Sequence, residues 1–282
     1  MSQVKVGSKY MQPPYKNWIF QNVSDPAYIP KVLRWFYKDH VEDSISMTGP
    51  FCGHYSTYHA LPVPPDGEDF GTYNLFMTNH LFYLDRAEYY GPQGTWIRPY
   101  CERWPENFLE MTSQPPTNEF RDPEWHGSRD GYHPFVSCYT PLMWEYDFKG
   151  SERTIDDGPN YRWVIIFKYP AGVSQEEGDE WFLHTFVPEV CEAEEVRRFL
   201  TAPCIPHFEK GPWNRVAEIW FEDSNRWHDA MVKNAARFTK PGWAQYDQFP
   251  YLEPYKDFTG IFVLDYPNSN HLRQWDGYYV TR

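Results

Sequence analysis

Apolar and aromatic positions of the chain recur after a constant interval of 146 residues, as from Trp35 to Trp181. In both copies an apolar run typical of a strand precedes apolar residues at helical spacing. The matched positions are Tyr15, Trp18, Ile19, Phe20, Trp35, Phe36 and Val41 in the first copy and Tyr161, Val164, Ile165, Ile166, Trp181, Phe182 and Val187 in the second. Such a repeat indicates that one α+β unit has been duplicated. The copies differ at one reactive position, because the first has His40 where the second has Phe186.

Each copy is predicted to contain its elements in the order β-α-β-β-α-β. In the first copy, the pattern predicts strands over 15–23, 53–60, 73–84 and 135–148 and helices over about 28–44 and from 85. In the second copy, it predicts strands over 161–169, 196–202, 213–221 and 258–266 and helices over about 175–191 and 223–238. We therefore predict two domains, 1–150 and 151–282, with an aromatic, Pro-rich insertion over about 86–134 and a tail over 268–282 that wraps back over the fold.

Composition narrows the classes of protein to which the chain can belong. A net charge of −13 disfavours a nucleic-acid partner, which needs a basic surface. The five cysteines form no C-x-x-C pair and fit a reducing cytoplasm. No apolar run approaches the roughly 20 residues of a membrane span, so we expect a cytoplasmic protein without a membrane partner. The aromatic content of 20% fits either an aromatic core or a pocket for a planar aromatic ligand.

Several segments resemble the EthD-like branch of the dimeric α/β-barrel proteins, which have a ferredoxin-like fold. The family's Trp-x-x-x-x-His segment is matched from Trp35 to His40, although Glu42 replaces the usual proline. In the second copy, the segments that resemble the family are Glu180-Trp181-Phe182, Val187-Pro188 and the stretch from Arg215 to Ser224. The resemblance implies an intrachain pseudo-dimer of two fused α+β domains, with a cavity between each sheet and its helices. Family members include cofactor-free decarboxylases, cyclases and dehydratases, as well as monooxygenases and haem enzymes.

Histidines on the predicted elements are the candidates for chemistry, because an imidazole exchanges protons near neutral pH. We predict catalytic roles for His40, His59 and His80. His54 and His59 lie on opposite faces of one strand, so only one of them can face the cavity, and the sequence leaves the face open. The predicted substrate contacts are Tyr55, Tyr58, His54, Trp35, Arg98 and His184.

These residues favour a cofactor-independent lyase, and we predict a decarboxylase of a bulky phenolic acid of the lignin-derived kind. His40 or His80 would act on the phenol, and Arg98 or a second histidine would orient the carboxylate. The spacings indicate no metal site and no nucleotide-binding loop, so we expect no metal and no cofactor. The expected partner is a small aromatic substrate, and a homodimer is compatible with the resemblance. The alternatives are a dehydratase or cyclase on an aromatic or polyketide-like substrate, a cofactor-free monooxygenase and a non-catalytic aromatic-binding protein.

Overall fold

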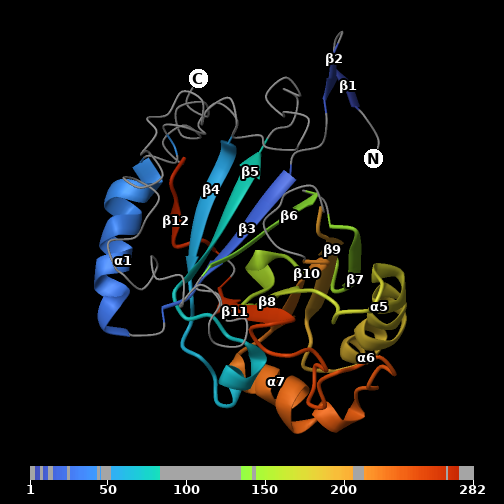
Figure 1. Ribbon diagram of the computed structural model, residues 1–282. Coiled ribbons are helices and arrows are strands. Elements are labelled where there is room, and N and C mark those ends of the chain that lie inside the picture. The colour runs from blue at the N-terminus through green and yellow to red at the C-terminus, as the bar shows by residue number, and fades with distance from the viewer. Residues whose placement is uncertain are drawn as a thin grey trace.

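The computed structural model describes residues 4–6, 9–11, 15–23, 26–42, 45, 52–82, 135–141, 144–205, 213–264 and 266–272. Within them, each half of the chain forms an antiparallel sheet (Figure 1). The first sheet contains β3 (Tyr15–Gln21), β4 (Cys52–His59), β5 (Phe76–Phe82) and β6 (Phe135–Pro141). The second contains β8 (Tyr161–Phe167), β9 (Arg198–Pro203), β10 (Arg215–Phe221) and β11 (Phe258–Val263). Both have the ferredoxin-like order in which the first and third strands are central, so the predicted duplicated α+β fold is confirmed.

Each sheet gains a fifth strand from the other half of the chain. β7 (Tyr146–Lys149) follows the first sheet in sequence but pairs with β9 of the second. β12 (Ser269–Asn270) follows the second sheet but pairs with β4 of the first. The single strand predicted over 135–148 is therefore wrong, because that segment divides into β6 and β7 in different sheets. A short hairpin of β1 (Val4–Val6) and β2 (Lys9–Met11) stands apart from both sheets.

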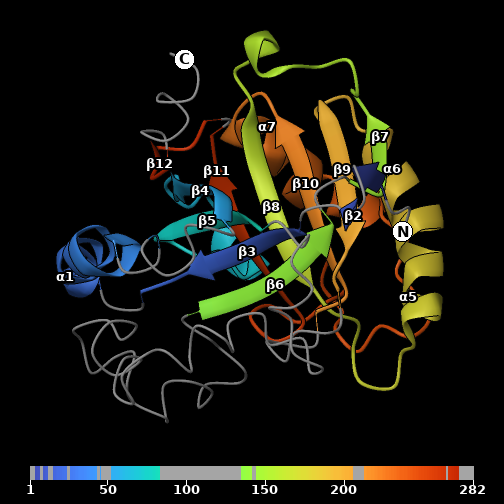
Figure 2. The ribbon, with the colours of Figure 1, turned by 90° about the horizontal axis from the view of Figure 1, so that it is seen from above.

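The helices lie on the outer sides of the paired sheets (Figure 2). In the first half, the 3-10 turn Pro26–Tyr28 leads into α1 (Ile29–Trp35) and a π-helical turn, Phe36–His40. In the second half, α5 (Gln175–Trp181), the π-helical turn Phe182–Phe186 and α6 (Val187–Cys191) are continuous. The Ser174 side chain caps α5 by accepting a hydrogen bond from the Glu177 amide. The π turns thus recur at the predicted interval, which confirms the duplication at the level of the backbone.

A further helical segment covers the second sheet. It consists of α7 (Ser224–His228), the π-helical turn Asp229–Lys233 and the 3-10 turn Ala235–Arg237. The Asp223 carboxylate caps this segment at the amide of Arg226. The corresponding helix of the first half, predicted from 85, and the insertion over 86–134 lie outside the described residues. A 3-10 turn, Gly67–Phe70, connects β4 to β5.

The two sheets pack face to face and form one apolar interior. Trp18 and Phe20 of β3 contact the same buried cluster as Val164 and Ile166 of β8. The sheet edges are also bridged, since the Tyr73 amide donates to the Gly260 carbonyl at 2.7 Å. At the opposite edge, the Ile205 amide donates to the Tyr139 carbonyl at 2.8 Å. The halves therefore form the intrachain pseudo-dimer that the sequence predicts.

Candidate functional site

The side chains of the first sheet divide between a face toward the second sheet and a face toward α1. Trp18 and Phe20 are in the cluster between the sheets. Because neighbouring residues of a strand point in opposite directions, Asn17 and Gln21 point to the helix side. On β4 the same alternation separates Tyr55, which packs with α1 residues, from Tyr58, which packs between the sheets.

A row of polar side chains crosses the helix side of the first sheet. Asn17 of β3 lies directly opposite Tyr139 of β6 and His80 of β5, and His80 lies opposite Tyr55 of β4. The rings of Tyr55 and His80 have centroids 4.0 Å apart and meet edge to face. Asn17, Tyr55 and Tyr139 are buried. We call these four residues the polar row; burial of so many polar groups in one layer points to a use beyond packing.

The C-terminal segment of the chain adds a second histidine beside the polar row. The His271 amide donates to the Tyr55 carbonyl at 2.8 Å, next to the pairing of β12 with β4. The His271 Nε2 atom lies 2.8 Å from the Thr57 hydroxyl, and its ring centroid is 4.9 Å from that of Tyr55. Sequence analysis missed His271, because the contact joins residues 214 positions apart. The only signal was the expectation that the tail wraps back over the fold.

The π-helical turn of the first half places His40 over the same region. The ring of Phe36, at the start of this turn, lies 5.8 Å from the His40 ring, 6.0 Å from that of His271 and 6.5 Å from that of Tyr55. His40 is also near enough to His80 to influence its pKa. We call His40, Tyr55, His80 and His271 the histidine cluster. Short π-helical turns are frequent at functional sites.

A tyrosine and a histidine form a further pair beside the histidine cluster. The Tyr37 hydroxyl lies 2.6 Å from His59 Nε2, and the two rings stack with centroids 5.9 Å apart. The His59 amide donates to the Asn268 side chain at 2.5 Å. The Ser269 side chain also forms a hydrogen bond with the Tyr37 hydroxyl. The C-terminal segment therefore holds both this pair and the histidine cluster in place.

Burial keeps three histidines of this region, His59, His80 and His271, uncharged at neutral pH. Desolvation, with smaller contributions from the neighbouring imidazoles of His40, His271 and His54, lowers the pKa of His80 to about 3. Desolvation lowers the pKa of His271 to about 4 and also lowers the pKa of His59. At neutral pH these three imidazoles are therefore neutral, so each can donate one hydrogen bond and accept another.

We expect the free energy of unfolding to fall as the pH decreases from 6.5 to 4. In the unfolded chain His80 and His271 take up protons near pH 6.5, whereas in the folded chain they do so near pH 3 and pH 4. The stabilisation that the two neutral imidazoles provide is therefore complete above pH 6.5. As the pH decreases to 4, we expect the free energy of unfolding to fall by about 3 kcal/mol in total, after allowance for partial solvent access. Urea unfolding at pH 7, 5.5 and 4 measures this loss. The variant His271→Asn should show a smaller loss; an identical loss would remove His271 from the explanation.

The second half has apolar side chains at the positions equivalent to the polar row. Trp163 of β8 occupies the place of Asn17 and lies opposite Ile219 and Phe262, and Ile219 lies opposite Phe199. Tyr139, His80 and Tyr55 are thus replaced by Phe262, Ile219 and Phe199. All four apolar residues are completely buried. The layer that is polar in the first half is therefore filled by apolar, mostly aromatic, packing in the second.

The second half also has an apolar residue at the position equivalent to His40. This residue, Phe186, is 2% exposed and packs within an aromatic cluster. The Phe186 ring lies 5.3 Å from Phe182 and 5.9 Å from Phe249, and it stacks on both. The ring of Trp181 is also 5.3 Å away. Of the two halves, the first therefore carries the candidate site.

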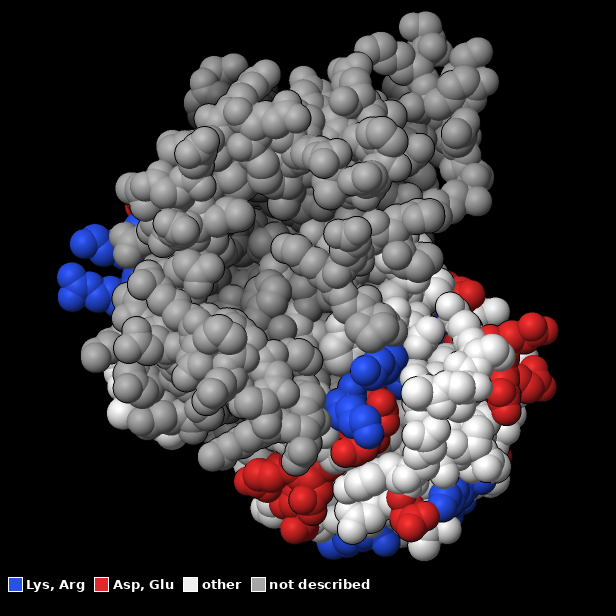
Figure 3. Space-filling view, viewed as in Figure 1, with Lys and Arg blue, Asp and Glu red and all other residues white. Residues whose placement is uncertain are grey.

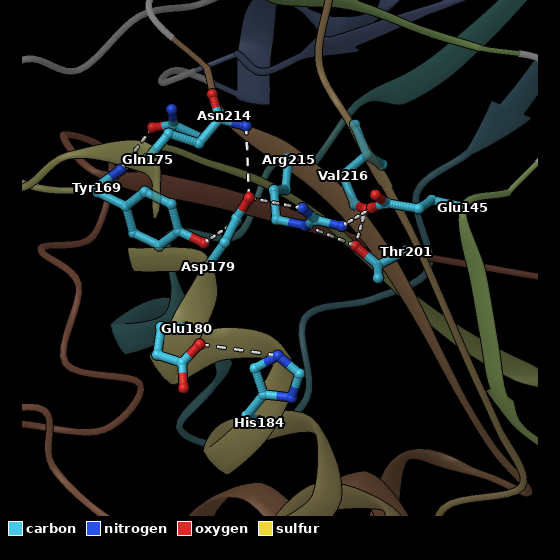
Figure 4. A network of polar contacts seen from close by, with 10 residues as sticks. All are labelled: Glu145, Tyr169, Gln175, Asp179, Glu180, His184, Thr201, Asn214, Arg215 and Val216. Atoms are coloured by element: carbon cyan, nitrogen blue, oxygen red, sulfur yellow. Dashed lines mark hydrogen bonds and ion pairs between the residues drawn. The ribbon is translucent and has the colours of Figure 1, made fainter. Parts of the chain in front are cut away.

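The charged groups on the helix side of the second half form a network that joins α5 to its sheet (Figure 4). Arg215 of β10 is 1% exposed and donates to Asp179 of α5 at 3.0 Å and to Glu145. The Tyr169 hydroxyl donates to the same Asp179 carboxylate at 2.6 Å, and burial raises the pKa of that hydroxyl. Because these charges satisfy one another, the network is a structural tie between helix and sheet.

The structure brings together some of the predicted site residues and separates others. His40, His80, Tyr55 and His59 all lie on the helix side of the first sheet. His54 and Tyr58 point to its other side, where His54 contacts Ser56 and Asn270. His184, which the sequence predicts to contact the substrate, lies in the π-helical turn that follows α5. Its side chain is exposed and faces Glu180, away from the histidine cluster (Figure 4). The Trp35 side chain and Arg98 lie outside the described residues.

Three further features of the described residues concern surface charge, membrane spans and metal sites. On the face in Figure 3, acidic and basic side chains of the second half are interspersed. None of the helices in the described ranges has the length and apolar character of a membrane span. Within those same ranges, no three His, Cys, Asp or Glu side chains gather in a way that could hold a metal ion.

Comparisons with known proteins add a likeness for the first half. The family described as the chalcone isomerase N-terminal domain matches residues 12–117, which include β3, β4, β5 and His40. No curated protein is significantly similar to the chain.

Solved structures resemble the chain over most of its length. An anthrone oxidase-like protein is 8% identical, with 90% of this chain and 91% of that protein covered and a TM-score of 0.44. A variant of chlorite dismutase from Candidatus Nitrospira defluvii is 9% identical, with 95% and 96% covered and a TM-score of 0.41. Likenesses this distant do not bear on activity. The resemblance to the EthD-like branch stays a prediction.

Proposed function

We propose that the chain is a cofactor-independent isomerase that cyclises a phenolic enone of the chalcone type in its first half. The observation that carries the proposal is the contrast between the halves: His40 and the polar row of the first correspond to five apolar residues of the second, which are Phe186, Trp163, Phe199, Ile219 and Phe262. The match of residues 12–117 to the chalcone isomerase N-terminal domain supports the same reaction class.

The reaction needs a base, a hydrogen-bond donor and no third reactant. His40 takes the proton of the phenol, and the phenolate oxygen forms a bond to the β-carbon of the enone. The electron pair of the double bond moves to the carbonyl oxygen, and the α-carbon then takes up the proton, so no atom is gained or lost. His80 and His271 remain neutral and can donate hydrogen bonds to the developing oxyanion, which is the main stabilisation such a step requires.

Decarboxylation of a phenolic acid is the second candidate, and the same phenol chemistry supports it. A carboxylate substrate is best held by a cation. The residues of the histidine cluster and the polar row include neither Lys nor Arg, and neutral imidazoles supply only hydrogen bonds. Arg98, the predicted carboxylate partner, is outside the described residues. The neutral donors and acceptors of the histidine cluster and the polar row therefore favour a substrate without a carboxylate.

Mass spectrometry separates the two reactions. We expect 2′-hydroxychalcone to lose its enone absorbance in the presence of the protein while its mass stays constant. A panel of phenolic acids incubated with the same protein is expected to keep its mass as well. Loss of the mass of carbon dioxide from any acid, with 2′-hydroxychalcone unchanged, would instead establish the decarboxylase. Loss of water would point to a dehydratase, and uptake of oxygen to a monooxygenase.

A further inference from the structure

Gln21, at the end of β3, carries a buried amide oxygen that the described residues leave without a partner. The residue is 5% exposed, and its Oε1 atom has no hydrogen-bond partner among the residues that the structure describes. Its backbone carbonyl accepts from the Leu75 amide, so the main chain at this position is satisfied. A buried amide oxygen without a partner opposes folding, and in native proteins such groups are few and call for an explanation.

The amide lies on the same face of β3 as Asn17 of the polar row, at the C-terminal end of the strand. Gln21 and Asn17 are four residues apart and share the helix side of β3. Four residues of a strand span roughly 13 Å. Gln21 is directly opposite Phe76, whose ring centroid is 4.3 Å from that of Phe36. One elongated ligand of two rings could therefore reach from His80, which is opposite Asn17, to Gln21.

The second half shows that folding does not require an amide at this position. At the repeat interval, the equivalent of Gln21 is Phe167. The Phe167 side chain is completely buried, and its ring centroid lies 4.7 Å from that of Phe182. An apolar ring thus fills this place where no site is present, which makes the polar amide in the first half a departure specific to the site.

We propose that Gln21 Oε1 accepts a hydrogen bond from a hydroxyl group on the substrate ring that lies furthest from His80. Gln21 is then a residue that determines specificity for a hydroxylated aromatic substrate. The inference rests on the proposed function, because it takes the substrate to lie along the polar row. It adds which end of the substrate is recognised and by which atom.

The experiment compares two ligands that differ only in that hydroxyl. Dissociation constants of 2′-hydroxychalcone and 4,2′-dihydroxychalcone are measured by quenching of tryptophan fluorescence. We expect the protein to bind the dihydroxy compound about 10-fold more tightly, as one hydrogen bond to a buried group provides. The variant Gln21→Leu should lose this preference and bind the two ligands equally. Gln248→Leu, at an exposed position of the second half, should keep the preference in full.

The outcomes distinguish this inference from the proposed function. A Gln21→Leu protein that is folded and retains the 10-fold preference would overturn the role of Gln21 and leave the isomerase proposal intact. If neither chalcone binds, the isomerase proposal fails, and 4-hydroxycinnamic acid is compared with cinnamic acid in the same way. A preference for the hydroxylated acid that Gln21→Leu abolishes would support Gln21, whereas no preference in either pair would overturn it.

Discussion

Replacement of His40 by Ala is expected to lower kcat/KM for the phenolic enone by at least about 100-fold. His40 stands in the π-helical turn beside Phe36, with His80 close by, and it is the residue to which the proposed mechanism assigns the proton of the phenol. Because the His40 side chain is only partly buried, we expect the variant to fold. Steady-state rates from the decrease in enone absorbance measure the effect.

The matched control for this prediction is His184→Ala. His184 lies in the equivalent π-helical turn of the second half, but its side chain is 68% exposed and contacts only Glu180 among described ion pairs. We expect the His184 variant to retain full activity. A folded His40→Ala protein with unchanged kcat/KM would exclude His40 as the base and would move that role to another member of the histidine cluster.

Replacement of Phe186 by Ala is expected to reduce the free energy of unfolding by about 3–5 kcal/mol. The ring is buried among Phe182, Phe249 and Phe238, with centroids at 5.3, 5.9 and 6.2 Å. Its removal leaves a cavity that these neighbouring rings can fill only in part. Urea unfolding of the full chain measures the change. The activity of each folded molecule should be unaffected, because the candidate site is in the other half.

Tyr266→Ala provides the comparison for this stability effect. Tyr266 is 57% exposed, so its truncation should change the free energy of unfolding by no more than about 0.5 kcal/mol. A change below about 1 kcal/mol in Phe186→Ala would show that the aromatic layer of the second half is loosely packed. The interpretation of that half as a filled, structural copy would then be wrong.

The alternation of residues along β4 illustrates how far the sequence could lead toward the site. It shows that His54 and His59 cannot share a face. It does not show which face meets the helix, because polar and aromatic residues occur on both. The choice depends on the packing of Trp18 and Phe20 against the second sheet, which is a contact between distant parts of the chain.

The correspondence between residues of the two halves could likewise be predicted only in part from the sequence. One interval relates β3 and the first helix to their copies, so His40 and Phe186 can be matched from the sequence alone. The interval changes at the later strands, because the connections in the two halves differ in length. His80 and Tyr55 could be matched to Ile219 and Phe199 only through the pairing of neighbouring strands.

The sequence by itself determined the duplication, the boundaries of most strands and helices, and the histidine in the first helical segment, since periodicity and the repeat are local properties of the chain. Only the tertiary structure decided that β7 and β12 each join the sheet of the other half and that His271 reaches the histidine cluster. These contacts depend on hydrogen bonds between strand edges, and such edges carry little sequence signal because any backbone can pair there.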